Sequence, residues 1–438
     1  MKIDAIFTPQ RTSQTSAVVR VLGNSAFRSL WIGQLASSLA VSVTMFVLAL
    51  RIYQLTGSST AVSALFLTFG VPAFLFAMAS GAIVDHFDKR TILILADVAR
   101  AVVAVLFLFA FGNIVIVYAL AFFYAFITQF ATPSEAPTIP RLVGNSDLVT
   151  ANSIYSFTFY TSLAIGSLLS GPLLRFFGPI GVFVFLCAMF IVAAISVSRI
   201  PKEAGKKKLR SLLGRYSLLD MAGKVLSSMS EGVAYIKTRQ KLLDALLLLM
   251  GTQVTLAILA TLGPAFAVQL LEVDVHDASL YLVGPAVVGI VVGALWVGNN
   301  SKAFTPSTFI QTGVTAAGLL LLIISLTVSL KRVAIFSGAT GGLIFLSLIL
   351  VLFFLLGFAN SLLDVPANSV LQHEAEGGMR GRVYGLLTAV VGGLGMLPVL
   401  VGGILGDIVG VGKVIFFLGV LIFAYGILRL RYNKIENG

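Results

Sequence analysis

Long apolar runs alternate along the chain with short charged segments or segments rich in Gly, Pro and Asn. A run of about 20 apolar residues is long enough for a helix to cross a bilayer. Twelve such runs lie at 29–53, 60–84, 91–112, 115–137, 150–174, 180–199, 242–270, 277–298, 307–330, 340–366, 382–406 and 410–430. Most connections are short, so neighbouring helices should run antiparallel. The pattern predicts an all-α membrane protein with twelve transmembrane helices.

One long connection divides these runs into six and six. The predicted units are an N-terminal segment at 1–28, a six-helix bundle at 29–199, a linker at 200–241, a second bundle at 242–430 and a tail at 431–438. The linker begins with a basic stretch and continues with apolar residues at helical spacing, which fits either a flexible linker or an interfacial helix.

A weak repeat indicates that the two halves are built alike. Glu135-Ala136-Pro137 aligns with Asp364-Val365-Pro366 at an offset of 229 residues, and Gly166 then falls on Gly395. Internal repeats of this kind are typical of membrane transporters. The repeat therefore predicts two pseudo-symmetric six-helix bundles.

Composition and charge agree with a protein embedded in lipid. The 438 residues are 58% hydrophobic and 11% charged, with a mean hydropathy of +1.00, which is too apolar for a soluble surface. Of the 30 Lys and Arg residues, 24 fall on the side of the termini and 5 on the other. The excess predicts cytoplasmic termini in the cell membrane, here a bacterial inner membrane. Contact of these loops with anionic membrane lipid explains the net charge of +12 without a nucleic-acid partner.

Other function classes lack their signatures. The N-terminal residues show no cleavable signal peptide, so the first run is expected to remain as a span. Cys187 is the single cysteine, and the three histidines fall in predicted loops, so we expect neither a disulfide nor a metal site. The chain has no phosphate-binding loop and no paired catalytic groups. We expect no enzyme activity and no cofactor.

A charged turn at Gly81–Leu93, GAIVDHFDKRTIL, interrupts two apolar runs. Its charges would be costly at bilayer depth, so the turn must lie at the membrane surface. A carboxylate beside a helix N-terminus, as Asp85 would be, is favoured by the helix dipole. The turn could also be a solvated segment that only fixes topology.

This turn resembles the loop between helices 2 and 3 of the major facilitator superfamily. It is similar to the branch of drug:H+ antiporters that includes macrolide-efflux proteins and the enterobactin exporter, as are ADVARA at Ala96–Ala101, LTGSSTAVS at Leu55–Ser63 and RGRVYGL at Arg380–Leu386. Asp88 replaces the second glycine of the loop pattern. The resemblance implies the two-bundle major facilitator fold and a gating loop that contains Gly81, Asp85, Lys89 and Arg90.

The resemblance also implies secondary active export of a small hydrophobic or amphipathic solute, coupled to proton antiport, by a protein expected to be a monomer. Helices 1, 4, 7 and 10 line the central cavity in this superfamily. Polar and aromatic residues of these helices are the predicted cavity lining: Gln34, Ser38, Tyr124, Gln129, Thr252, Gln253 and Asn360, with Phe126, Phe130, Phe353 and Phe358. For each of them taken alone, interhelical packing is the alternative role that the residue type favours.

Proton coupling needs an ionisable group within the spans. The predicted coupling residues are Glu135, Asp364, Asp97 and Arg100, with Glu135 preferred, although Glu135 could also form a plain ion pair with Arg141. Many members of the resembling family carry an acidic residue midway along helix 1, where this chain has Ala40 and Val41. The alternatives to a drug exporter are a carrier for lysolipids or other lipids and, in another class, a non-transporting membrane sensor or scaffold.

Overall fold

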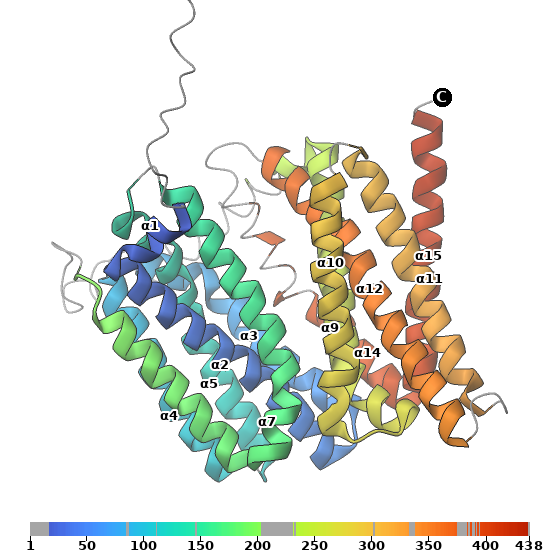
Figure 1. Ribbon diagram of the computed structural model, residues 1–438, viewed down its shortest axis with the longest axis horizontal. Coiled ribbons are helices and arrows are strands. Elements are labelled where there is room, and N and C mark those ends of the chain that lie inside the picture. Colours follow the sequence, from blue (N-terminus) through green and yellow to red (C-terminus); the bar gives the residue numbers. More distant parts are fainter. Residues whose placement is uncertain are drawn as a thin grey trace, which may run out of the picture.

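The computed structural model is almost entirely helical (Figure 1). It describes residues 17–84, 87–110, 112–144, 147–202, 234–300, 303–332, 338–374 and 395–436, together with residues 231, 383, 386–387, 390 and 392–393. The main helices are α1 (Ala17–Gly23), α2 (Ser25–Thr56), α3 (Ser59–Val84), α4 (Lys89–Ala110), α5 (Ile114–Glu135), α6 (Ile139–Leu142), α7 (Leu148–Ser198), α9 (Gln240–Ala265), α10 (Gly284–Asn300), α11 (Pro306–Ser329), α12 (Gly338–Glu374), α14 (Met396–Ile408) and α15 (Val411–Glu436).

Ten helices in the described part of the chain are long and apolar enough to cross a membrane. One of them, α7, holds two of the predicted spans, because the chain turns within it at Gly178, where φ is 62°. A positive φ costs glycine little, and Pro179 follows as the start of the second span. The eleventh predicted span is represented by α14, which is shorter than the others. The all-α membrane fold is thus confirmed, whereas the full count of twelve stays a prediction.

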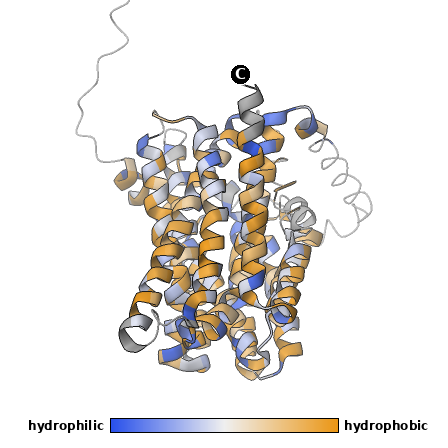
Figure 2. Ribbon diagram, turned by 90° about the vertical axis from the view of Figure 1, so that its right-hand side faces the viewer, coloured by the Kyte–Doolittle hydropathy of each residue, from blue (hydrophilic) through white to orange (hydrophobic). Residues whose placement is uncertain are grey.

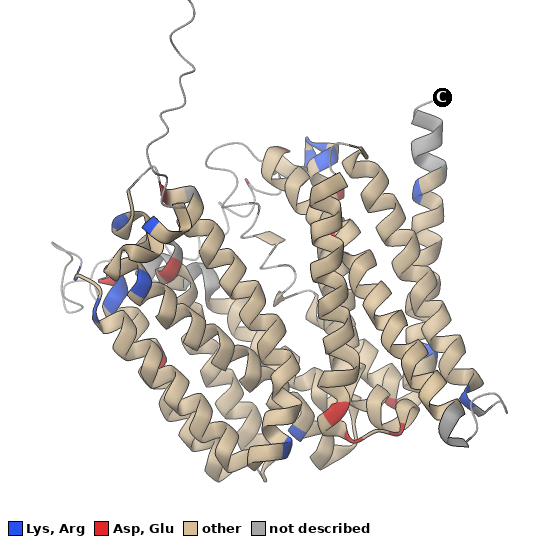
Figure 3. Ribbon diagram, viewed as in Figure 1, with Lys and Arg blue, Asp and Glu red and all other residues tan. Residues whose placement is uncertain are grey.

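The helices form two bundles, α2–α7 and α9–α15, which stand side by side in Figure 1. Apolar residues cover the helices over most of their length, and hydrophilic residues gather towards their ends (Figure 2). Lys, Arg, Asp and Glu show the same preference for the helix ends (Figure 3). Such a belt of apolar surface bounded by charged ends is what a bilayer requires. Most of the predicted linker at 200–241 lies outside the described residues.

Polar caps fix where the spans begin. The Asn24 side chain accepts hydrogen bonds from the backbone N–H groups of Ala26 and Phe27 at the start of α2. Thr305 accepts from the N–H of Thr308 at the start of α11, with Pro306 as the first helical residue. These residue types are the ones favoured at helix starts, because they supply acceptors for donors that have no partner within the helix.

In each bundle, a hydrogen bond from a side chain to a carbonyl group connects the start of the first helix with the segment that ends the fourth. Asn24, just before α2, donates from Nδ2 to the carbonyl of Leu142 at 2.6 Å, at the end of the short helix that follows α5. Arg239, just before α9, donates from Nη1 to the carbonyl of Glu374 at 3.0 Å, at the end of α12. A residue at an equivalent place thus satisfies an equivalent helix end. The pseudo-symmetry predicted from the repeat is visible in this pair of contacts.

Candidate functional site

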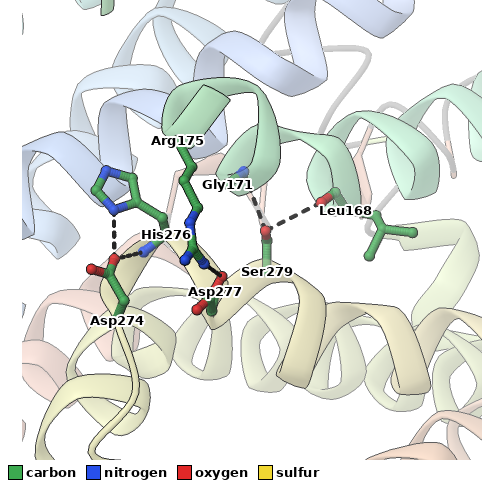
Figure 4. Close-up of polar contacts among 7 residues, drawn as sticks. All are labelled: Leu168, Gly171, Arg175, Asp274, His276, Asp277 and Ser279. Carbon is green, nitrogen blue, oxygen red and sulfur yellow. Dashed lines mark hydrogen bonds and ion pairs between the residues drawn. The ribbon is translucent and has the colours of Figure 1, made fainter. Parts of the chain in front are cut away.

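Polar contacts join the two bundles (Figure 4) at the end of the molecule remote from the termini (Figure 1), here called the distal end. The guanidinium of Arg175, in α7, lies 2.7 Å from the carboxylate of Asp277, in the 3-10 turn η5 (Val275–Asp277). The Ser279 hydroxyl accepts from the N–H of Gly171 and donates to the carbonyl of Leu168, both at 3.2 Å. The helix backbones approach closely because Gly171 has no Cβ: one placed there would lie 1.8 Å from the carbonyl oxygen of His276.

His276 links both bundles through its two ring nitrogens. Nδ1 lies 2.5 Å from Oδ1 of Asp274, and Nε2 lies 2.9 Å from Nε2 of Gln54 in α2. A neutral ring that carries its proton on Nδ1 satisfies both contacts, since Nε2 then accepts from the Gln54 amide. The backbone N–H of His276, followed by its ring, holds the pKa of the Asp274 carboxyl below its ordinary value. The distal end is therefore closed by a charged and hydrogen-bonded network.

A cavity of about 580 Å³ lies between the bundles and within the second one. Phe46, Ala49 and Leu50 of α2 and Leu163 and Ser170 of α7 line it from the first bundle, and the rest of the lining comes from the second. The polar members of the lining are Ser170, Thr252, Thr255, Ser279, Asn360 and Tyr425. No charged side chain belongs to the lining among the residues described. A space of this size and polarity fits a small apolar or amphipathic molecule.

The structure brings some of the predicted cavity residues to this space. Thr252, Asn360 and Phe353 line it. Gln253, the neighbour of Thr252, is exposed and is absent from the lining. The predicted residues of the first bundle, by contrast, lie elsewhere.

Tyr124 is buried within the first bundle, where the rings of Phe69 and Phe190 pack against it edge to face. Gln129 donates to the carbonyl of Ala125 in its own helix. The aromatic residues Phe126 and Phe130 pack against each other, and Phe358 packs against Trp296; neither pair lines the cavity. The carbonyl of Ser38 accepts from the Ser42 hydroxyl within α2. The sequence analysis missed the small and aliphatic residues that form most of the lining. Such residues occur throughout a membrane protein, so their type does not indicate a cavity.

A second, much smaller cavity gathers the ionisable residues of the first bundle. Its polar lining comes from α2, α4, α5 and α7: Gln34, Ser37, Asp97, Arg100, Glu135 and Tyr155. Its volume of about 10 Å³ corresponds to a single water molecule. Three of the four predicted coupling residues thus meet at one place, together with Gln34, which had been predicted to line the central cavity.

The core of this cluster is an ion pair between neighbouring turns of α4. Nη1 of Arg100 lies 3.2 Å from Oδ1 of Asp97, and both side chains are almost fully buried. The Ser37 hydroxyl bridges them, donating to Asp97 at 2.8 Å and accepting from Arg100 at 3.0 Å. The spacing i, i+3 predicts such a pair. The contribution of Ser37 and Tyr155 could not be predicted, because it depends on how α2 and α7 face α4.

The remaining predicted residues are spread over the molecule. Asp85 lies outside the described residues, and Gly81 falls near the end of α3. Lys89 is buried at the start of α4, and Arg90 donates to the carbonyl of Ser198 at the end of α7. A cation at a helix C-terminus is favourably placed. Asp364, in α12, accepts from the side chain of Asn368 at 3.2 Å and stands apart from the cluster of the first bundle.

The fold and the two cavities define a multi-pass membrane transporter built from paired helical bundles. The sequence model of the Major Facilitator Superfamily matches residues 30–398, and the chain belongs to this family. The family acts on small-molecule substrates by transport, so the protein is not an enzyme. Among the described residues, no group of three or more His, Cys, Asp or Glu side chains could hold a metal ion.

Curated relatives match nearly the whole chain. The chain is 22% identical over 405 residues to the multidrug efflux pump Tap of Mycolicibacterium fortuitum, covering 90% of this chain and 92% of the relative. It is 23% identical over 433 residues to the enterobactin exporter EntS of Citrobacter koseri, covering 93% of each. The predicted membership of the drug-efflux and enterobactin-exporter branch agrees with these two relatives.

Solved structures share the fold at low sequence identity. The nucleoside transporter NupG superposes with a TM-score of 0.67 at 11% identity, covering 93% of this chain and 99% of that one. The POT family transporter PepTSo superposes with a TM-score of 0.69 at 14% identity, covering 94% and 98%. These likenesses show that the chain has the same fold as these transporters.

Proposed function

We propose that the protein exports a small hydrophobic or amphipathic molecule through the 580 Å³ cavity. The observation that carries this proposal is the character of the lining, which is apolar with a few hydroxyl and amide groups and has no charge among the described residues. A strongly charged solute would lose its hydration there, and no charged group would compensate for the loss. An apolar molecule with a few polar groups has little hydration to lose and can form hydrogen bonds with the hydroxyl and amide groups of the lining. The two relatives whose names describe a multidrug efflux pump and an enterobactin exporter support the same choice.

We place both termini in the cytoplasm of a bacterial cell, with the protein in the inner membrane. The 24 to 5 distribution of Lys and Arg between the two sides supports this orientation. The distal end, where Arg175 meets Asp277, is then the outer side. The contacts that close this end support an inward-facing state in a cycle in which the bundles rock against each other.

The driving force in this proposal is a proton that enters the cluster of Asp97, Arg100 and Glu135. The cluster sets one guanidinium against two carboxylates, so one added proton makes it neutral. Asp97 already receives hydrogen bonds from Ser37 and Arg100, which leaves Glu135 as the group that takes the proton. Helix α2 connects the two sites, because it carries Gln34 and Ser37 in the small cavity and Phe46 and Leu50 in the large one.

Counterflow in proteoliposomes tests the proposal. A panel of neutral, cationic and anionic drugs, a catecholate siderophore and a lysophospholipid would be tested with and without a pH gradient. We expect saturable exchange of at least one apolar or amphipathic member and uphill movement only when the gradient is present. Uptake of the lysophospholipid alone would favour the lipid carrier. Flux that ignores the gradient would refute proton antiport, and no flux at all would favour a sensor or scaffold.

A further inference from the structure

We propose that Asp407 is the gate residue of the outer end, where it caps a helix of the opposite bundle. Asp407 lies at the end of α14, in the second bundle. Its Oδ1 accepts from the backbone N–H of Ser59 at 2.7 Å, and its Oδ2 accepts from the backbone N–H of Thr60 at 2.9 Å. Oδ2 also accepts from the hydroxyl of Ser58 at 2.6 Å. All three donors belong to the start of α3, in the first bundle.

The hydrogen-bond acceptors of the first N–H groups of α3 show why this contact matters. The first N–H groups of any helix have no partner within the helix and need acceptors from elsewhere. Ser58 supplies two acceptors locally: its hydroxyl accepts from Ala61 at 3.2 Å and its carbonyl accepts from Val62 at 3.3 Å. The two remaining donors, on Ser59 and Thr60, go to Asp407. The cap of α3 is thus completed by a residue that lies almost 350 positions later in the chain.

Close packing just inside the cap makes the contact specific. A Cβ on Gly403 would lie 2.3 Å from the Ser63 hydroxyl and 2.7 Å from the carbonyl oxygen of Ser59. The bare backbone of α14 therefore lies directly on α3, one helical turn before Asp407. Asp407 itself is exposed at the rim. The carboxylate is consequently held in register by the glycine contact and yet has access to water, so the cap can be released and remade.

Separation of α3 from α14 at the outer end must break the three hydrogen bonds together, because a single carboxylate accepts all of them. Removing an N-cap acceptor shifts an equilibrium by about 2-fold to about 30-fold. We therefore assign to Asp407 a shift of that size in the ratio of inward-facing to outward-facing protein. The Arg175–Asp277 pair closes the same end through a different pair of elements, α7 and η5.

The test measures the ratio of the two states directly. Spin labels at exposed Phe177 in the first bundle and exposed Lys413 in the second, in a Cys187→Ser background, report the separation of the bundles at the outer end. We expect Asp407→Ala to increase the population with the longer separation by about 2-fold to about 30-fold, Asp407→Asn to have a smaller effect, and Asp407→Glu to restore part of the wild-type ratio. Gly403→Ala should act in the same direction through a steric clash.

Asp147→Asn is the matched control. It also removes a carboxylate with a charged partner, but that partner is Arg20 of α1, which contacts helices of the first bundle. We expect no shift of the ratio for this variant. Unchanged ratios in both Asp407→Ala and Asp407→Asn, in folded protein whose wild type populates both separations, would overturn the proposal. The inference rests on alternating access; a wild type that shows one separation under all conditions would instead refute that proposed function.

Discussion

The guanidinium of Arg100 lies 3.2 Å from the carboxylate of Asp97 inside the first bundle, and both side chains are almost fully buried. Removing one partner of a buried ion pair leaves the other charge uncompensated and costs about 3–5 kcal/mol. Asp97→Ala should therefore lower the free energy of unfolding by about that amount. Thermal unfolding in detergent, followed by tryptophan fluorescence, would measure it.

Replacement of both charges separates stability from function. The double variant Asp97→Leu with Arg100→Met should recover most of the stability, because an apolar pair of similar volume avoids the desolvation of two charges. It should nevertheless lose transport driven by a pH gradient. A double variant that remained as unstable as Asp97→Ala would contradict the ion-pair argument, and one that still transported would exclude the pair from coupling.

Glu135→Gln should uncouple transport from the proton gradient. The amide cannot take up a proton, so uphill transport driven by pH should fall at least about tenfold, while exchange of substrate between the two sides continues. Proteoliposome assays of the two modes would show the difference. Glu272→Gln is the control, because Glu272 is an exposed partner of Lys331 at the distal end, far along the chain from the cluster. Equal loss of both modes in Glu135→Gln would favour a structural role.

Gly251→Leu should block the cavity without strain. Gly251 lines the cavity, and a Cβ at this position would meet no atom within 4 Å. The added side chain therefore fills space that the substrate needs, and we expect KM to rise about tenfold with an unchanged unfolding temperature. Gly357→Leu is the contrasting variant: a Cβ there would lie 1.9 Å from the carbonyl oxygen of Ala286, so this change should impair folding. Unaltered transport by folded Gly251→Leu would place the substrate elsewhere.

The distal network should respond to strong acid. Because hydrogen bonds from His276 lower the pKa of Asp274 in the folded protein, its ionised form stabilises the fold. This stabilisation is present above the pKa of the unfolded chain, about 3.9, and is lost as pH falls through the lower folded value. The unfolding temperature of wild type should thus exceed that of Asp274→Asn at pH 6, and the gap should close below about pH 4. A gap that widened in acid would contradict the assignment.

The extent of the spans followed from the sequence because the bilayer leaves few choices. Apolar length and charged ends predicted the helices, and the gap between the predicted spans 150–174 and 180–199 contains Gly178, which takes a positive φ. The Asp97–Arg100 pair was predictable from spacing along one helix. These features depend on local chemistry alone.

The sequence did not predict which side of each helix faces a cavity and which side faces another helix. Helix α2 is apolar on most of its surface, and buried residues occur on several of its sides, so nothing marked Gln34 as belonging to the small cavity rather than the large one. Tyr124 was misplaced for the same reason, since an aromatic ring packs equally well inside a bundle. The cap of α3 by Asp407 joins residues whose sequence separation excludes any local signal.

The matching ties from Asn24 to Leu142 and from Arg239 to Glu374 have a mechanical consequence. Each hydrogen bond lies within its own half, so we expect the first helix of a half and the segment that ends its fourth helix to move as one rigid unit. In the proposed alternating-access cycle, substrate passage would then require little deformation inside either half, and the free-energy changes of the cycle would fall on the contacts between the halves.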